Sequence, residues 1–362
     1  MKRQGQLFSL QQGRGIAAMA VVLFHLSIML ALPRYLGQEL FSDYTWRGNL
    51  GVDFFFVLSG FIIVFAHNHD IDRPDRLRNY LGRRFIRLFP VYWVYVGVFC
   101  TLVALGFGSG ATIPETWDQW ISTIFLVRLD KFTFPIAPAW TLVHELAFYL
   151  MFSLLIANKR WGIIIFSMWM VACFMVREYP EFEDMTPWTA YFSPLNLNFL
   201  VGMLAYLGWK HGRQNIVKWA FPAGLLLLAT LYALESKGAA YAHVQLGYAV
   251  AFGLAITGAA TLETARQWPS KLAVLNLIGD ASYSIYLTHI AVLGLLAKIL
   301  IKISEYAPMP AELIFLLVFI GTIICGCLAH LIVERPLISM LRLHFSAKQP
   351  IIDQRSHGAF KS

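Results

Sequence analysis

The chain consists of long apolar runs separated by short polar segments along almost its whole length. A bilayer core of about 30 Å requires roughly 20 apolar residues in each crossing helix. Ten runs of about this length are bounded by charges, Gly, Pro or polar clusters: 14–32, 49–67, 88–108, 137–157, 161–177, 191–209, 217–234, 243–262, 273–301 and 312–333. This pattern predicts an all-α, polytopic membrane bundle of about ten transmembrane helices.

The composition agrees with a membrane protein. Hydrophobic residue types make up 58% of the 362 residues and charged types 14%, whereas a soluble globular protein has roughly 45–50% and about 25%. Disordered, collagen-like and disulfide-scaffold classes are excluded as well. The four cysteines, Cys100, Cys173, Cys325 and Cys327, fall within expected spans, where packing is the better interpretation. No metal site is expected.

Positive charge is distributed unevenly between the two sides that these spans define. Of the 29 Lys and Arg residues, 21 fall in 1–14, 68–87, 158–160, 210–218, 263–272 and 334–362. Because Lys and Arg mark the cytoplasmic side, both termini are predicted to be cytoplasmic. The same asymmetry accounts for the net charge of +8, so nucleic acid is not an expected partner.

Three smaller features complete the expected organisation. Met1–Arg3 and the following apolar stretch predict an uncleaved first helix rather than a signal peptide. Residues 109–136 are amphipathic and predict an extracytoplasmic loop with an interfacial or re-entrant helix. Residues 1–340 are expected to form the transmembrane domain and 341–362 a polar, mobile cytoplasmic tail.

Few ionisable residues enter the predicted spans, and each is a candidate functional group because a charge at the bilayer centre costs about 2.5–3.5 kcal/mol. Arg14 and His25 lie 11 residues apart, so they are about 20° apart around one helix and about 16 Å apart along it. One helix face therefore presents a cation near the cytoplasmic surface and an imidazole deeper in the membrane. The alternative is a snorkelling arginine and a histidine that hydrogen-bonds to a neighbouring helix.

Asp53 is expected near the outer end of the second span, at a depth similar to that of His25. Consecutive helices usually lie side by side, so one hypothesis is an Asp53–His25 pair that fixes the imidazole tautomer and raises its base strength. The other is that Asp53 caps the start of its helix. Ser59 and Gly60 follow near mid-span, where small residues let a ligand or another helix approach closely.

Six arginines and no lysine lie in the expected cytoplasmic loop 68–87. Arg84 and Arg87 share a helix face at the start of the third span. A guanidinium group binds phosphate in a bidentate way, which favours a nucleotide-like ligand or a phospholipid headgroup. A topology signal combined with anionic lipid binding explains the cluster equally well.

Two further columns of polar residues share a face of their helices. Thr141, Glu145 and Tyr149 recur every four residues in one span, which makes Glu145 an acid/base candidate, an anchor for an acceptor hydroxyl, or part of a structural network. In the ninth span, Tyr286 and His289 share a face with Ser282. From spacing alone, His289 fits a core histidine better than a catalyst.

Taken in order, these residues resemble the membrane acyltransferase-3 family. The matching segments run from residue 14 to residue 336: Arg14–Ala18 with His25, Gly51–Phe61, Arg83–Pro90, Trp140–Leu142 with Glu145 and Tyr149, Ser282–Leu287 with His289, and Glu334–Pro336. Each fragment alone is weak, but their order and spacing are jointly specific. The chain looks closest to the short, single-domain branch that resembles exopolysaccharide and O-antigen O-acetyltransferases.

The resemblance implies transfer of an acyl group, usually acetyl, from cytoplasmic acetyl-CoA to a hydroxyl of an envelope or secreted polysaccharide or its lipid-linked precursor. It implies a bacterial inner-membrane protein in which His25 is the catalytic base and Arg14 supports it, with Asp53 and Glu145 as further catalytic candidates. The residues expected to contact the donor or shape its passage are Arg83, Arg84, Arg87, Ser59, Gly60 and Phe61. The remaining candidates, for substrate binding, are Trp140, Tyr149, Tyr286 and His289.

A transporter or flippase of a polysaccharide precursor or acyl group is the competing class, in which buried His, Asp and Glu residues relay protons. Discontinuous helices at matching positions in two halves of the chain would favour it, and the sequence shows no such symmetry. The arginine cluster in one inner loop favours a phosphate-bearing cytosolic donor instead. A scaffold without chemistry leaves the buried ionisable groups unexplained.

Overall fold

Long apolar helices make up the structure, a computed structural model that describes residues 7–106, 113–129, 131–176, 186–269 and 272–347. These residues contain no strand. The helices are α1 (Phe8–Ala31), α2 (Ser42–Thr45), α3 (Leu50–His67), α4 (Leu77–Ala104), α5 (Trp117–Phe125), α6 (Trp140–Ala157), α7 (Lys159–Met175), α8 (Pro187–Tyr191), α9 (Leu197–His211), α10 (Gln214–Val217), α11 (Ala220–Ser236), α12 (Tyr241–Thr264), α13 (Ala273–Asp280), α14 (Ser282–Ser304), α15 (Ala311–Ala329) and α16 (Arg335–Ala347). The predicted all-α class is confirmed.

Nine helical segments of the described part of the chain are long and apolar enough to cross a membrane. The tenth expected span, 161–177, corresponds to α7, which has 17 residues in the described part. At about 1.5 Å per residue, α7 is slightly shorter than a bilayer core. The protein is therefore a multi-pass membrane protein, with α7 as an additional apolar helix.

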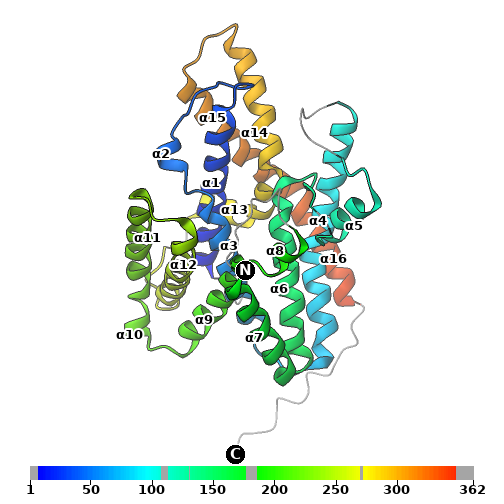
Figure 1. The fold of residues 1–362 in the computed structure, drawn as a ribbon, viewed down its shortest axis with the longest axis vertical. Helices are drawn as coiled ribbons and strands as arrows, with labels where there is room; N and C mark the ends of the chain where they lie inside the picture. The colour runs from blue at the N-terminus through cyan, green and yellow to red at the C-terminus, as the bar shows by residue number, and fades with distance from the viewer. Residues whose placement is uncertain (1–6, 107–112, 130, 177–185, 270–271, 348–362) are drawn as a thin grey trace, which may run out of the picture.

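Helix α1 lies at the centre of the bundle. It packs against α3, α12, α13, α14 and α15. Figure 1 shows α11 and α12 on one side of this centre and α4, α6 and α16 on the other. Helix α3 in turn packs against α9, and α4 packs against α16. Residues far apart in the sequence are thereby brought to one central region.

Helix α4 begins at Leu77 rather than at residue 88, where its apolar run is expected to start. Its first turns carry four of the six arginines of the expected loop 68–87 and are helical, because charge lowers the hydropathy of a segment without preventing helix formation. Pro90 lies inside the helix and does not end it. Arg83, Arg84 and Arg87 are consequently held on a helix rather than on a loop.

The C-terminal helix also continues beyond its predicted end. A π-helical turn, His330–Glu334, follows α15, and α16 then runs to Ala347. The expected boundary between residues 340 and 341 falls inside α16. The ring of Phe345 lies so close to Gly82 that an added Cβ on this glycine would overlap it. Residues 348–362 of the expected tail lie outside the described part.

The amphipathic segment 109–136 contains the nine-residue helix α5. The side chain of Thr116 caps this helix by accepting a hydrogen bond from the backbone N–H of Gln119. The hydroxyl of Tyr92 in α4 donates to the carbonyl of Thr123 at 2.9 Å, which ties α5 to the bundle. Residues 109–112 and 130 of the segment lie outside the described residues.

Candidate active site

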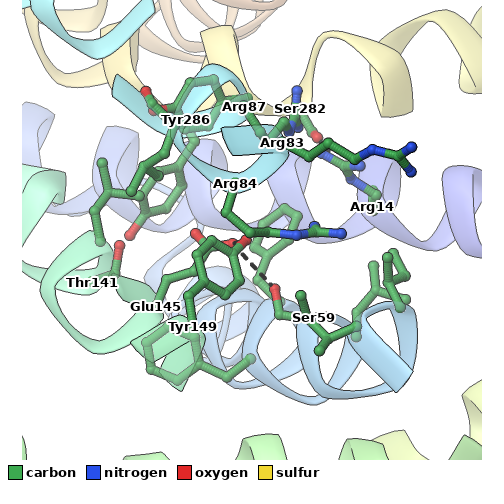
Figure 2. Close-up of a pocket in the computed structure, with 18 of the residues that line it drawn as sticks. Arg14, Ser59, Arg83, Arg84, Arg87, Thr141, Glu145, Tyr149, Ser282 and Tyr286 are labelled. Atoms are coloured by element: carbon green, nitrogen blue, oxygen red, sulfur yellow. Dashed lines mark hydrogen bonds between the residues drawn. The ribbon is translucent and has the colours of Figure 1, made fainter. Parts of the chain in front are cut away.

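A cavity of about 570 Å³ lies between α1, α3, α4, α6, α14 and α16. All six helices contribute charged or hydroxyl residues to its lining. The polar members are Arg14, Ser59, Arg83, Arg84, Arg87, Thr141, Glu145, Tyr149, Ser282, Tyr283, Tyr286 and Arg342. Figure 2 shows the labelled members of this set converging from separate helices. Phe55 and Phe56 contribute apolar surface.

Arg84 is held by a chain of hydrogen bonds that begins in the loop after α3. Its Nη2 donates to Nε2 of His67 at 2.7 Å, and Nδ1 of His67 donates to the Asp70 carboxylate at 2.8 Å. The guanidinium lies over the rings of Tyr80 and Tyr149, 5.7 and 5.5 Å from their centroids. Its Nε is buried and has no hydrogen-bond partner among the described residues. Buried donors are normally satisfied, so this N–H is an exception among the described polar groups of the site.

Arg87 forms a buried ion pair with Glu334, which is 1% exposed. The distance from Nη1 of Arg87 to the carboxylate is 2.7 Å. The other carboxylate oxygen accepts from Nδ1 of His330 at 2.9 Å and from Ser284 at 2.7 Å. The π-helical turn places His330 and Glu334 together, and such turns are frequent at functional sites. Glu334, which the sequence showed only as part of a motif, is therefore the residue that holds Arg87 in place.

We expect Glu334→Gln to destabilise the protein by about 1–3 kcal/mol, because the buried Arg87 would lose its compensating charge. Thermal unfolding in detergent measures this loss. The double change Arg87→Met with Glu334→Leu should restore most of the stability, since an apolar pair of similar volume can replace a buried ion pair. A double variant that is less stable than Glu334→Gln would contradict this explanation.

Glu145 lies on one face of α6 and receives two hydrogen bonds. The hydroxyl of Tyr149 donates to it, and Ser59 of α3 donates at 3.5 Å, the dashed contact in Figure 2. Thr141, Glu145 and Tyr149 all line the cavity, as their spacing predicts for a shared face. Arg14 also lines the cavity, and its Nε donates to Ser282 at 3.1 Å. The cavity thus combines one carboxylate with several guanidinium groups.

His25 does not line this cavity but is linked to its wall by ring contacts. The ring centroid of Tyr286, a lining residue, is 5.8 Å from that of His289, which is 4.9 Å from that of His25. Phe55 lies against Tyr286, with a centroid distance of 6.0 Å. Tyr286 and His289 thus connect the wall of the cavity to His25.

The hydrogen bonds of the two histidines define which nitrogen of His25 is basic. Nδ1 of His289 donates to the carbonyl of Tyr286 at 2.7 Å, so its Nε2 is left to accept. Nδ1 of His25 lies 2.9 Å from the carbonyl of Val21 and 3.3 Å from Nε2 of His289. Both neighbours accept, so Nδ1 of His25 carries the proton and Nε2 keeps the lone pair.

The hypothesis of an Asp53–His25 pair is wrong. The Asp53 carboxylate accepts hydrogen bonds from Asn198 at 2.8 Å, from Tyr241 at 3.1 Å and from Gln245 at 3.3 Å. Asp53 is 3% exposed, and its donors come from α9 and α12 rather than from α1. The partner that holds His25 is His289. Asp53 is the fourth residue of α3, and Asn49 rather than Asp53 occupies the N-cap position.

Three other predicted site residues lie away from the cavity. Gly60 and Phe61 face α9, where an added Cβ on Gly60 would approach the carbonyl oxygen of Phe199 to 2.1 Å, and Phe61 is fully buried. Trp140 packs against His144, with ring centroids 5.6 Å apart. Of the Ser59–Phe61 segment, only Ser59 lines the cavity. The glycine therefore serves close helix packing.

Sequence reasoning missed several residues that the structure brings into these networks. They are Asn198, Tyr241, Gln245, His330 and Arg342. Asn198 and Gln245 are fully buried amides within apolar spans, and that signal was available in the sequence. Among the described residues, no group of three or more His, Cys, Asp or Glu side chains is placed to hold a metal ion.

Comparison with known proteins is consistent with this arrangement. The family model of the acyltransferase domain matches residues 7–331. The exopolysaccharide production protein ExoZ of Rhizobium meliloti is 29% identical over 80% of this chain and 90% of its own length. The acyltransferase MdmB of Streptomyces mycarofaciens is 25% identical over 93% of this chain and 92% of its own length. No solved structure matches significantly. The chain therefore belongs to the acyltransferase-3 family and is a membrane acyltransferase.

Proposed function

We propose that the protein transfers an acetyl group from cytoplasmic acetyl-CoA to a hydroxyl of an envelope or secreted polysaccharide or its lipid-linked precursor. The observation that carries this proposal is the cavity in which three arginines of α4 and Arg14 converge. Guanidinium groups recognise phosphate, and coenzyme A presents phosphates at one end and a thioester at the other. The name of the ExoZ relative supports a polysaccharide acceptor.

The donor enters from the cytoplasm, with its phosphates on Arg84 and Arg87 and its arm running through the cavity. This direction rests on the charge asymmetry of the loops, which favours cytoplasmic termini. The protein then lies in the bacterial inner membrane, with residues 1–340 as its membrane domain. Glu145 and its donors Ser59 and Tyr149 line the middle of this route. The thioester then passes Phe55 and Tyr286 to reach His25.

His25 acts as the general base in the transfer step. Its Nε2 accepts the proton of the sugar hydroxyl while the hydroxyl oxygen attacks the thioester carbonyl. The carbon–sulfur bond then breaks, an ester forms, and the departing coenzyme A thiolate takes up a proton. The hydrogen bonds from Nδ1 to Val21 and His289 hold the ring in the required tautomer. Base catalysis of this kind contributes roughly 10²–10⁴-fold to a rate.

The experiment that tests the proposal compares the polysaccharide of three bacterial strains. They carry the intact gene, a deletion of the gene, or the deletion complemented with the gene. Ester-linked acetyl groups on the purified polysaccharide, measured by NMR before and after mild base, should disappear with the deletion and return with complementation. An unchanged acetyl content in the deletion strain would reject the proposed function.

We expect Arg84→Gln to raise the KM for acetyl-CoA by about 10–100-fold, since a charge-assisted hydrogen bond is worth roughly 1.5–3 kcal/mol. The kcat should change little, because Arg84 lies on the phosphate side of the route. Arg78→Gln is the matched control, because Arg78 is an exposed arginine of the same helix and does not line the cavity. Equal KM values for the two variants would remove Arg84 from the donor site.

A further inference from the structure

A second, wider cavity of about 1560 Å³ lies beside the first. Most of its lining comes from three segments that are distant in the sequence: the start of α1, the end of α12 with the loop that follows, and the stretch from the π-helix into α16. Phe8, Trp268 and Arg335 represent these three segments. All three belong to stretches that the charge distribution places on the cytoplasmic side. This cavity is therefore expected to be open to the cytosol.

The two cavities share part of their walls. Arg14, Arg87 and Arg342 line both of them. Coenzyme A also has two halves, an adenosine 3′-phosphate and a pantetheine arm, joined by a pyrophosphate whose inner phosphate completes 3′,5′-ADP. Three guanidinium groups at the junction are suited to the pyrophosphate, because each can bind phosphate oxygens in a bidentate way. The first cavity, which Arg84 lines, then holds the arm and its pyrophosphate end, and the wider cavity is left for the rest of the nucleotide.

The carboxylates in the wider cavity are already occupied by donors from the protein. Glu263 accepts from the backbone N–H groups of Phe8 at 2.8 Å and Ser9 at 2.7 Å, at the start of α1. Asp280 accepts from Gln11, and Glu334 from Arg87. These hydrogen bonds engage the three carboxylates with groups other than Arg266 and Arg335.

Two arginines of this cavity have no such partners. Arg266 and Arg335 are exposed, and neither forms an ion pair with any described residue. They lie on the α12–α13 loop and at the start of α16, on elements other than α4. Their charge is therefore available for an anionic ligand.

Trp268 provides an aromatic surface with a fixed orientation. Its indole N–H donates to the side chain of Gln12 at 2.7 Å, and its ring meets Phe221 edge-on with a centroid distance of 5.2 Å. Stacking of a base on an aromatic side chain is worth roughly 1–3 kcal/mol. Because Trp268 lines the cavity beside Arg266, a ligand with both a phosphate and a planar base fits these residues better than a phosphate alone.

We propose that the wider cavity binds the 3′,5′-ADP half of the acyl-CoA donor, with Arg266 and Arg335 on its phosphates and Trp268 against adenine. This inference rests on the proposed function and assigns the donor to both cavities at once. An anionic phospholipid headgroup also carries a phosphate but has no base. A comparison of 3′,5′-ADP with such a lipid therefore shows which of the two the cavity binds.

The test measures binding to the full-length protein in detergent by titration calorimetry, with 3′,5′-ADP as the probe. We expect 3′,5′-ADP to bind and to compete with acetyl-CoA, and the variant Arg266→Gln/Arg335→Gln to bind it about tenfold more weakly. Trp268→Leu should also weaken binding of 3′,5′-ADP but not of inorganic pyrophosphate. Arg213→Gln is the control, because Arg213 is an exposed arginine of another loop expected in the cytoplasm and lines neither cavity.

Steady-state kinetics provide the second arm. The double arginine variant should raise the KM for acetyl-CoA about tenfold and leave the KM for S-acetyl-pantetheine, which lacks the nucleotide, unchanged. Equal KM changes for the two donors would overturn the inference. The inference would also be overturned if 3′,5′-ADP did not bind, or if short-chain phosphatidylglycerol displaced bound 3′,5′-ADP and acetyl-CoA did not. Binding of 3′,5′-ADP without any acetyl transfer would instead reject the proposed function while leaving the nucleotide site in place.

Discussion

Replacing His25 with alanine should lower kcat for acetyl transfer by about 10²–10⁴-fold, which is the contribution expected of a general base. The KM for acetyl-CoA should stay near that of the unchanged protein, because His25 lies beyond the Phe55–Tyr286 pair and does not line the cavity. The side chain gives up its contacts with Val21, His289 and the ring of Phe24. We therefore expect the variant to fold and to insert in the membrane.

The control for this prediction is His211→Ala, because His211 is an exposed histidine at the end of α9. It should transfer acetyl groups at the rate of the unchanged protein. Thermal unfolding of both variants separates a catalytic loss from a folding loss. A His25→Ala protein that keeps its kcat would remove His25 from the mechanism, whatever its stability.

Replacing Gly60 with leucine should prevent stable folding, with a loss of at least about 3 kcal/mol, the upper end of the usual range for overpacking. An added Cβ on Gly60 would lie 2.1 Å from the carbonyl oxygen of Phe199 in α9. The contact is reciprocal, since a Cβ on Gly202 would lie 1.8 Å from the carbonyl oxygen of Val57 in α3. Both obstacles are backbone atoms, so α3 and α9 would have to separate.

The matched control is Gly97→Leu, because Gly97 is also a helical glycine, but a Cβ added to it would meet no described neighbour within 4 Å. Detergent-extracted protein, analysed by size exclusion and thermal unfolding, should be normal for Gly97→Leu and scarce or aggregated for Gly60→Leu.

Ser59→Ala should instead fold normally and change the KM for acetyl-CoA, because Ser59 lines the cavity. A folded Gly60→Leu protein with an altered KM alone would place Gly60 in the donor passage.

The helical fold could be predicted from the sequence because about 20 consecutive apolar residues have few structural alternatives in a membrane. The positions of the helix starts were harder to predict. The arginine-rich first turns of α4 and the continuation into α16 are helical in spite of their charge. The π-helical turn at His330–Glu334 leaves no periodic signal in the sequence. Hydropathy therefore locates the membrane-embedded core of a helix better than its polar ends.

The candidate site was predictable where its residues share one helix face. Helical spacing alone brought Thr141, Glu145 and Tyr149 together, and all three line the cavity. Partners on different helices were not predictable in this way. Asp53 was expected beside His25 in the adjacent helix, but its donors Asn198 and Gln245 lie far along the chain. Such contacts depend on how the helices pack, which spacing within one helix does not determine.

The most direct test of the account is to incubate the purified protein with radiolabelled acetyl-CoA and an envelope polysaccharide, and to measure the label bound to carbohydrate. The account predicts a base-labile label on the polysaccharide with the unchanged protein and a loss of about 10²–10⁴-fold with His25→Ala. Label that remains on coenzyme A with the unchanged protein, or that reaches carbohydrate equally with both proteins, would contradict it.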